Sequence, residues 1–333
     1  GLDHVHLAGS GAAGFFVILK MISRLSSRTE VVLRAYTASS LVIAIRQAGL
    51  KPVLCDISLD DFNALYDDMI HRCDRSTLCA VPVHMFGIPW SRVLELRQSL
   101  PPDIFVVEDA CQAFGAKVHG VSVGSAGDAG FFSFSRGKNL PTWTGGCIVT
   151  ASEKFSFSLK KEADLWLRPV SPAGALGSFL KTLGLFFVFN PHGYALTHPL
   201  VSLLKETRAP AEIPLKRYTH FQASLGVSLL QTARDAFEKR RENGLFILEA
   251  LKGSDRFIIP KIEPNLTPVF NRLPVLIRDA SLVDKMIAAL ARRGIEASRF
   301  YFKPLHHLFD LGYHPQEFPN AVYFAERLVT LPV

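Results

Sequence analysis

The sequence predicts an α/β fold in which a mostly parallel sheet lies between helices, followed by a smaller α+β domain. Over the first two thirds of the 333 residues, short apolar runs alternate with segments of helical spacing. That alternation is typical of a parallel sheet with helices on both faces. The pattern changes after a long helical segment at 222–251, which indicates a second, smaller unit.

Five apolar runs in the first part have the length and composition of buried strands. They are "HVHLAG" (4–9), "EVVLRAY" (30–36), "KPVLCDI" (51–57), "TLCAVPVH" (77–84) and "DIFVVED" (103–109). Between these runs, apolar residues recur at the spacing of a helix, which predicts helices at 39–49 and 90–100. We therefore expect a large domain over residues 1–225.

The remaining residues, 226–333, predict a small C-terminal domain. After the long helical segment comes an apolar run at 268–277 and a helix near 280–293. The mixed-charge run "FEKRRENG" within the long segment is typical of a solvated helix face.

One apolar segment, residues 173–204, does not fit a plain soluble protein. Its apolar core is interrupted by Lys181 and ends at Asn190-Pro191, so it is too short to span a bilayer, which takes about 20 apolar residues. A buried helix, an arm of a dimer and a helix lying in a membrane interface all remain open.

Charge and cysteine usage exclude several classes of protein. The net charge is +7 and the pI is about 9.2, yet the charges are scattered, and no nucleic-acid motif is present. A basic balance suits anionic substrates or an anionic membrane surface. The five cysteines have no zinc spacing, so we expect no metal, reduced thiols and a cytoplasmic protein.

A glycine-rich turn, "GSGAAG" (9–14), follows the first strand and begins an apolar helix. It matches the dinucleotide pattern G-x-G-x-x-G, but the next strand ends in Tyr36-Thr37 rather than in the acidic residue that would bind a ribose. A phosphate cradle at a helix N-terminus remains. A tight turn without a ligand is the alternative.

Asp109 and Lys138 suggest which phosphate-containing ligand the turn would bind. Asp109 ends a buried strand, where it could cap the next helix or pair with a cationic ring nitrogen. Lys138 follows the apolar run 129–134 and precedes paired glycines. Pyridoxal phosphate needs all three features: an amine for its aldehyde, a carboxylate for its ring nitrogen and a phosphate cradle.

With these motifs in order, the sequence resembles the DegT/DnrJ/EryC1/StrS family of sugar aminotransferases. "GSGAAG" is similar to the family's phosphate turn, "VVEDACQAFGA" to its EDAAQA signature, and "GDAGFFSFSRGKNL" to its lysine loop. "FQASLGVSLL", "GIEASRFYFKPLHHL" and "ERLVTLPV" follow in family order. The resemblance implies the aspartate aminotransferase fold (fold type I) and an active site between the subunits of a homodimer.

The resemblance also implies residue roles. Lys138 would bind the cofactor aldehyde covalently and then move a proton, and Asp109 would pair with the ring nitrogen. Gln112 would lie against the ring. The phosphate would be held by Ser133 and the turn residues Gly11, Ala12 and Ala13. Substrate contacts are expected at Arg217, Tyr301 and His306.

Several positions depart from the family pattern. Ala12 replaces a threonine of the phosphate turn, Ala38 a ring-stacking aromatic, and Leu215 an asparagine that reaches across the dimer. Phe300 replaces a histidine, and Trp143-Thr144 a Gly-Glu pair. Both ends look truncated relative to the family. These departures suggest an altered substrate pocket but leave Lys138 and Asp109 in place.

The expected function is the amination of a nucleotide-linked keto sugar, with glutamate as donor, for surface polysaccharide synthesis. A sugar dehydratase working from the pyridoxamine form is one alternative, although the resemblance implies a histidine at position 138 in such enzymes. A degenerate scaffold with a regulatory role or a membrane contact through residues 173–204 is the other.

Overall fold

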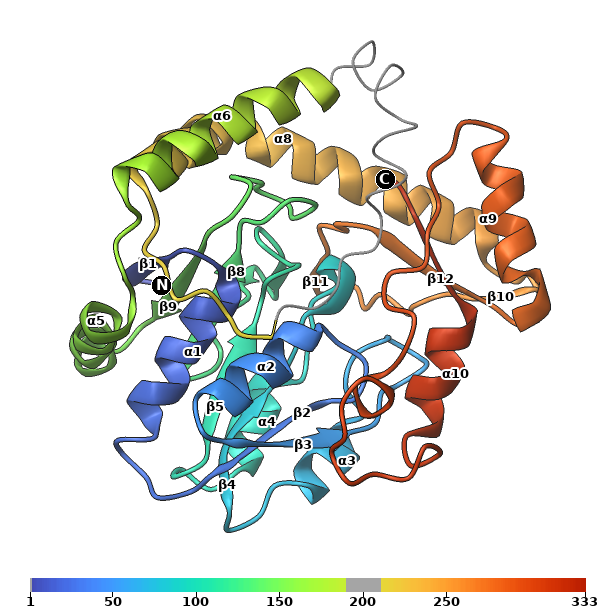
Figure 1. Ribbon diagram of the computed structural model, residues 1–333. Helices are drawn as coiled ribbons and strands as arrows, with labels where there is room; N and C mark the ends of the chain where they lie inside the picture. The colour runs from blue at the N-terminus through green and yellow to red at the C-terminus, as the bar shows by residue number, and fades with distance from the viewer. Residues whose placement is uncertain (1, 190–210) are drawn as a thin grey trace.

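The computed structural model describes residues 2–189 and 211–333, and its centre is a seven-stranded sheet (Figure 1). Six strands run in the same direction, and β9 is antiparallel to both of its neighbours, β1 and β8. The sheet order is β1 (His4–Ala8), β9 (Gly146–Thr150), β8 (Ala129–Ser133), β5 (Phe105–Asp109), β4 (Thr77–Val81), β2 (Glu30–Arg34) and β3 (Lys51–Cys55). The mostly parallel sheet expected from the sequence is confirmed.

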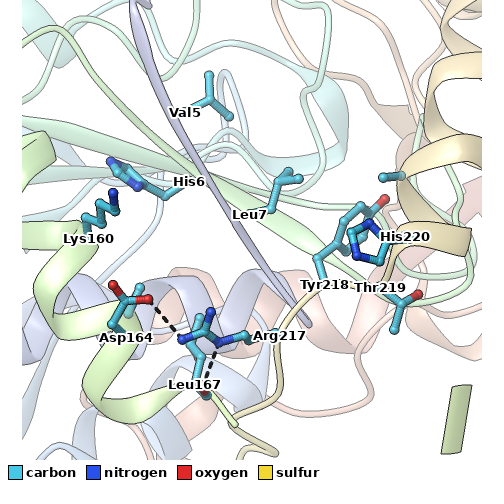
Figure 2. Close-up of a pocket in the computed structure, with 12 residues that line it drawn as sticks. Val5, His6, Leu7, Lys160, Asp164, Leu167, Arg217, Tyr218, Thr219 and His220 are labelled. Atoms are coloured by element: carbon cyan, nitrogen blue, oxygen red, sulfur yellow. Dashed lines mark hydrogen bonds and ion pairs between the residues drawn. The ribbon is translucent and has the colours of Figure 1, made fainter. Parts of the chain in front are cut away.

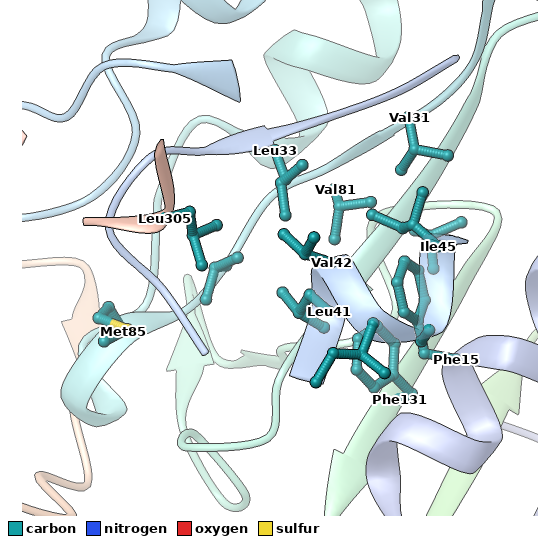
Figure 3. Packing of buried hydrophobic residues seen from close by; sticks show 14 of the residues in the cluster. Phe15, Val31, Leu33, Leu41, Val42, Ile45, Val81, Met85, Phe131 and Leu305 are labelled. Carbon is teal, nitrogen blue, oxygen red and sulfur yellow. The ribbon is translucent and has the colours of Figure 1, made fainter. Parts of the chain in front are cut away.

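Helices cover both faces of this sheet. One face carries α1 (Gly11–Ile22), α2 (Ser39–Gln47) and α5 (Glu153–Trp166). The other carries α3 (Tyr66–His71) and α4 (Val93–Ser99) over a separate apolar cluster. Figure 3 shows the first core, where Phe15 of α1 stacks on Phe131 of β8 with ring centroids 4.8 Å apart. α1 is buried on nearly every side because it packs between α2 and α5 as well as on the sheet.

The C-terminal part is built on a second, antiparallel sheet. It consists of β10 (Phe257–Ile258), β12 (Leu273–Ile277) and β13 (Leu328–Leu331), with α9 (Val283–Ala291) and α10 (Pro319–Arg327). A third sheet joins β11 (Leu266–Thr267) to β6 (Lys117–Val118) and β7 (Val121–Ser122). Short 3₁₀ turns lie at η1 (Met85–Gly87), η2 (Ala280–Leu282) and η3 (Leu305–His307).

The long helix α8 (His220–Leu251) connects the two parts. The expected domain boundary, between 225 and 226, falls inside this helix. α10 ties the C-terminal part to the large sheet, because the Asp56 carboxylate accepts hydrogen bonds from Asn320 N (3.0 Å) and Ala321 N (2.9 Å). Phe324 adds ring contacts with Tyr36 and Phe62, each with centroids 4.9 Å apart.

The apolar segment forms α6 (Pro172–Phe189), which runs beside α8 (Figure 1). Phe179 of α6 meets Phe221 of α8 with ring centroids 5.2 Å apart. The large apolar side chains of its first part, residues 172–184, are nevertheless exposed, from 43% for Phe179 to 58% for Leu176. A helix buried within this chain is therefore wrong for residues 172–184, and the expectation for 190–204 lies outside the described residues. No helix in the described ranges is long and apolar enough to cross a membrane.

Candidate functional site

The carboxyl ends of β1, β5 and β8 meet at one edge of the sheet and bring the predicted phosphate turn to Ser133. A Cβ atom at Gly11 would lie 2.8 Å from Cys111 Sγ and 2.9 Å from Ser133 Cβ. Only glycine fits there without displacing a neighbour. Gly11, Cys111 and Ser133 thus form one narrow recess at the start of α1.

The end of the loop that carries Lys138 packs against the glycine-rich turn at Gly9–Gly14. Ser10 forms a β-bridge with Gly145, and a Cβ atom at Gly146 would lie 2.5 Å from Gly11 N. Ser10 also caps α1, because its Oγ accepts a hydrogen bond from Ala13 N (3.0 Å). A phosphate held by the Ala13 amide would therefore have to share that donor with Ser10.

Asp109 is buried at the end of β5, with 4% of its surface exposed. Its Oδ1 accepts a hydrogen bond from Cys111 N (2.9 Å). Burial raises the pKa of the Asp109 carboxyl, while the Cys111 hydrogen bonds and the charges of Lys138 and His84 act in the opposite direction. The structure thus brings Lys138 and Asp109 into electrostatic contact, as a shared cofactor site requires.

Lys138 lies half-buried in the loop between β8 and β9. Its backbone N donates to Ser135 O (3.1 Å). In the described ranges, its amine has neither a hydrogen bond nor an ion pair. The next residue, Asn139, is buried, and its Oδ1 also lacks a partner there. An available amine beside a buried carboxylate matches the role predicted for Lys138.

Tyr301 reaches this region from the C-terminal part. The Tyr36 hydroxyl donates to Tyr301 O (2.9 Å) and accepts from Tyr301 N (3.1 Å), which fixes the backbone there. Burial raises the pKa of the Tyr301 phenol, and Tyr36, Asp109 and Cys111 raise it further. The phenol therefore lies within electrostatic reach of Asp109 and stays neutral near pH 7.

The side chains of Gln112 and His306 form hydrogen bonds with backbone groups of other segments. Gln112 Oε1 accepts from Phe86 N (3.0 Å) and its Nε2 lies 3.4 Å from Met85 Sδ. His306 Nε2 donates to Pro315 O (3.1 Å). Burial is the main cause that lowers the pKa of His306. A contact of either side chain with a cofactor or substrate stays a prediction.

Arg217 lines a different pocket, of about 410 Å³, between β1, α5 and the start of α8 (Figure 2). Its Nη2 pairs with Asp164 Oδ1 (2.9 Å), and its Nε donates to Leu167 O (3.2 Å). This pocket contains neither Lys138 nor Asp109. The Arg217 guanidinium is thus bonded to α5 and to its C-terminal end, and a contact with the substrate stays a prediction.

A buried pair next to Asp109, His84 and Glu108, was not anticipated. The Glu108 oxygens accept from His84 Nε2 (2.9 Å) and from the amides of Gly124 (2.8 Å), Ala126 (2.7 Å) and Gly127 (2.8 Å). Strand alternation was the available signal, because Glu108 must point to the face opposite Asp109. The sequence also did not predict that Cys111 lies beside Gly11 and Ser133. A single cysteine has no pattern that would indicate such a position.

Glu108→Gln should destabilise the protein by about 1–3 kcal/mol, because a neutral amide turns donors toward backbone N–H groups. Burial raises the pKa of Glu108, but the His84 hydrogen bond and charge and the backbone amides outweigh it, so the pKa lies below its usual 4.5. This stabilisation is present above pH 4.5 and is lost as the pH falls through the lowered pKa. Denaturant unfolding would measure it, with exposed Glu263→Gln as control; equal stabilities for the two variants would refute the role.

The described residues fit pyridoxal phosphate. The recess at Gly11 excludes a Cβ atom. Among the residues that the structure describes, the buried carboxylate of Asp109 has no bonded cation, and Thr37 Oγ1 and Asn139 Oδ1 have no hydrogen-bond partner. Lys138 would hold the aldehyde, Asp109 the ring nitrogen, and Ser133 with the start of α1 the phosphate. When bound, the group supplies an electron sink for the substrate carbon.

Comparison with known proteins places the chain in a family. The model of the DegT/DnrJ/EryC1/StrS aminotransferase family matches residues 1–163 and 215–333. An uncharacterized protein, MJ1066, of Methanocaldococcus jannaschii is 27% identical over 97% of this chain and 79% of its own length. A dTDP-4-dehydro-2,6-dideoxy-D-glucose 3-dehydratase of Saccharopolyspora spinosa is 25% identical over 80% of this chain and 58% of its own length.

Solved structures share the fold. The sugar aminotransferase CalS13 from Micromonospora echinospora matches with a TM-score of 0.78 and 21% identity, over 100% of this chain and 83% of its own. An E. coli GDP-4-keto-6-deoxy-D-mannose-3-dehydratase with bound hydrated PLP matches with a TM-score of 0.75 and 18% identity, over 99% of this chain and 83% of its own. The fold, cofactor class and enzyme class expected from the sequence are thereby confirmed: the chain belongs to the DegT/DnrJ/EryC1/StrS family of PLP-dependent sugar aminotransferases.

Proposed function

We propose that this protein converts a nucleotide-linked keto sugar to an amino sugar, with glutamate as amino donor, for the synthesis of a surface polysaccharide. The observation that carries the proposal is the electrostatic effect of Lys138 on the Asp109 carboxyl. An amine without a described partner acts electrostatically on a buried carboxylate at the carboxyl edge of the sheet. Family membership supplies the reaction type.

In this proposal each residue has a defined task. The Lys138 amine would hold the cofactor aldehyde covalently and would then accept and return a proton at the substrate carbon. Asp109 would keep the ring nitrogen of the bound cofactor protonated, and its burial would strengthen that interaction because the local dielectric is low. Gly11 lets the backbone approach a phosphate closely, and Ser133 offers a hydroxyl to it.

The names of relatives support the substrate class. They include a GDP-perosamine synthase of E. coli O157:H7, 32% identical over 38% of this chain, and a spore coat polysaccharide biosynthesis protein of Bacillus subtilis, 25% identical over 100% of it. The dehydratase among the relatives favours a second candidate, a sugar dehydratase. The resemblance implies a histidine at position 138 for that reaction, so Lys138 favours the aminotransferase.

The assembly and location belong to the same proposal. We expect a cytoplasmic homodimer in which the partner subunit completes the active site. The exposed apolar side chains of α6 would contact either the partner or a membrane surface. Gel filtration with light scattering tests the first, and vesicle flotation the second.

The proposal is tested by the absorbance of the purified protein with added pyridoxal phosphate, before and after glutamate. We expect a visible band from the lysine-bound cofactor, which glutamate converts to the near-ultraviolet band of its amino form. The half-reaction needs no sugar, so it does not depend on knowing the substrate. A protein that binds the cofactor but never responds to any amino donor would contradict an aminotransferase.

A further inference from the structure

An apolar groove of about 440 Å³ lies between β1, the edge strand of the large sheet, and α8. Its lining includes Val5 and Leu7 from β1, and Val227 and Leu230 from α8. These side chains are exposed, from 47% for Leu7 to 63% for Val227. Among the described residues that line the groove, none is charged. An open apolar surface of this kind is typical of a site that another molecule covers.

The groove also includes part of the loop that carries Lys138. Phe134 follows β8 and Leu140 comes two residues after Lys138; both are buried and line the groove. Tyr218 lines it too, and its hydroxyl lies 2.8 Å from the hydroxyl of Thr142 in the same loop. A molecule that fills the groove therefore packs against the segment that positions Lys138.

A second uncovered apolar surface lies on α6, which runs beside α8 (Figure 1). Leu176, Leu180 and Leu183 recur at helical spacing, so they lie on one side of α6, and they are 58%, 55% and 57% exposed. We call these three residues the leucine ridge. Lys181 and Thr182 instead line a pocket that α6 shares with the start of α8. The helix thus directs polar residues toward this chain and the leucine ridge away from it.

The leucine ridge and the groove are separate surfaces within one chain. Among the described residues that line the groove, none belongs to α6. α6 lies within residues 164–214, which the family model does not match. The surface that covers the leucine ridge is therefore to be sought in features of this chain rather than in features shared by the family.

We propose that, in a symmetric dimer, the leucine ridge of one copy fills the apolar groove of the other. A two-fold axis produces this contact twice, so both surfaces of both copies are covered. This inference rests on the homodimer expected in the proposed function, and it identifies one of the contacts that hold it together. The partner's ridge then supports the loop that carries Lys138.

Charge and shape favour a second copy over a membrane. An uncharged helix face matches a groove whose described lining has no charge, whereas an anionic lipid headgroup would find no cation there. A convex ridge fills a concave groove, but a membrane surface would cover the ridge and leave the groove open.

Mixing two charge variants tests the inference. Leu180→Glu places a carboxylate on the leucine ridge, and Leu230→Lys places a cation in the groove. Each variant alone would bury two charges per dimer in apolar contacts, so we expect its dimer Kd, measured by analytical ultracentrifugation, to rise at least about 100-fold. In an equimolar mixture one contact pairs glutamate with lysine and the other is native, so the dimer should return.

The matched control is Leu94→Glu, which changes a leucine of α4 with a similar exposure, 56%, and should leave the dimer intact. The reversed pair, Leu180→Lys with Leu230→Glu, repeats the test if either first variant misfolds. Single variants that remain dimeric, or mixtures of folded variants that stay monomeric, would overturn the inference. Binding to phosphatidylglycerol vesicles that needs Leu180, in a protein that never dimerises, would overturn it in favour of a membrane.

The effect on the Lys138 loop has its own measurement. The Kd of pyridoxal phosphate should rise in each monomeric variant and recover in the mixture. An unchanged Kd would overturn the support that the partner's ridge gives to this loop.

The inference and the proposed function fail in different ways. A cofactor band that responds to glutamate, in a protein whose dimer does not depend on Leu180 or Leu230, would refute the contact alone. A dimer that depends on both leucines, in a protein that never responds to an amino donor, would refute the aminotransferase and leave the contact standing.

Discussion

Replacing Lys138 with alanine should abolish turnover and remove the visible absorption of the lysine-bound cofactor. The variant loses both the covalent attachment and the group that moves the proton. Proton transfer by a positioned side chain alone contributes about 10²–10⁴-fold, so we expect kcat to fall by at least about 10³-fold. The fold should survive, because the Lys138 amine forms no hydrogen bond or ion pair in the described ranges.

Two controls separate chemistry from charge. Lys138→Arg keeps a cation near Asp109 but cannot form the covalent bond, so it should be as inactive as the alanine variant. Lys154→Ala removes an exposed lysine of α5 and should leave activity unchanged. Substantial activity in Lys138→Arg would mean that Lys138 acts only through its charge, and the assigned role would be wrong.

The sequence predicted the strands that carry the site because their apolar runs are short and bounded by polar residues. β5 ends at Asp109 and β1 ends just before Gly9, as expected, and parallel strands necessarily bring such ends to one edge. β8 and β9 were not anticipated as strands. The β9 run follows a loop rich in glycine and polar residues, and its antiparallel place between β1 and β8 depends on pairing far along the chain.

Side-chain partners were harder to predict than backbone elements. The family pattern places Gln112 and His306 near a ligand, but their hydrogen bonds depend on Phe86 and Pro315, which come from other segments. The same holds for Arg217, whose guanidinium pairs with Asp164, 53 residues earlier. Which atom a polar group meets is set by tertiary packing, and one sequence contains little of that information.

The sequence could not predict which surface covers the apolar side chains of α6, for a related reason. Apolar composition predicts burial but not the surface that provides it. The structure shows Phe179 against Phe221 while Leu176 and Leu180 stay exposed. The contact with α8 therefore accounts for Phe179, while the neighbouring leucines offer a surface to a partner.

Asp109→Asn should lower activity and raise the stability of the cofactor-free protein at the same time. The amide cannot keep the ring nitrogen protonated, so kcat should fall on the order of 10²–10³-fold, as when one preorganised electrostatic contact is removed. The cofactor should still attach to Lys138, and its band should persist. A kcat within a few-fold of the wild type would show that another group performs this task.

The stability gain follows from the sign of the pKa shift. Burial raises the pKa of Asp109 above its usual 3.8, so the charged form is disfavoured in the folded protein. The carboxylate thus costs stability at every pH above both pKa values, and the cost disappears as the pH falls below them. Asparagine removes the charge while its Oδ1 still accepts from Cys111 N. Denaturant midpoints of the cofactor-free proteins should differ at neutral pH and converge in acid, whereas exposed Asp235→Asn should give no gain. A stabilising variant with lost turnover would show that the buried carboxylate is kept for chemistry at the expense of the fold.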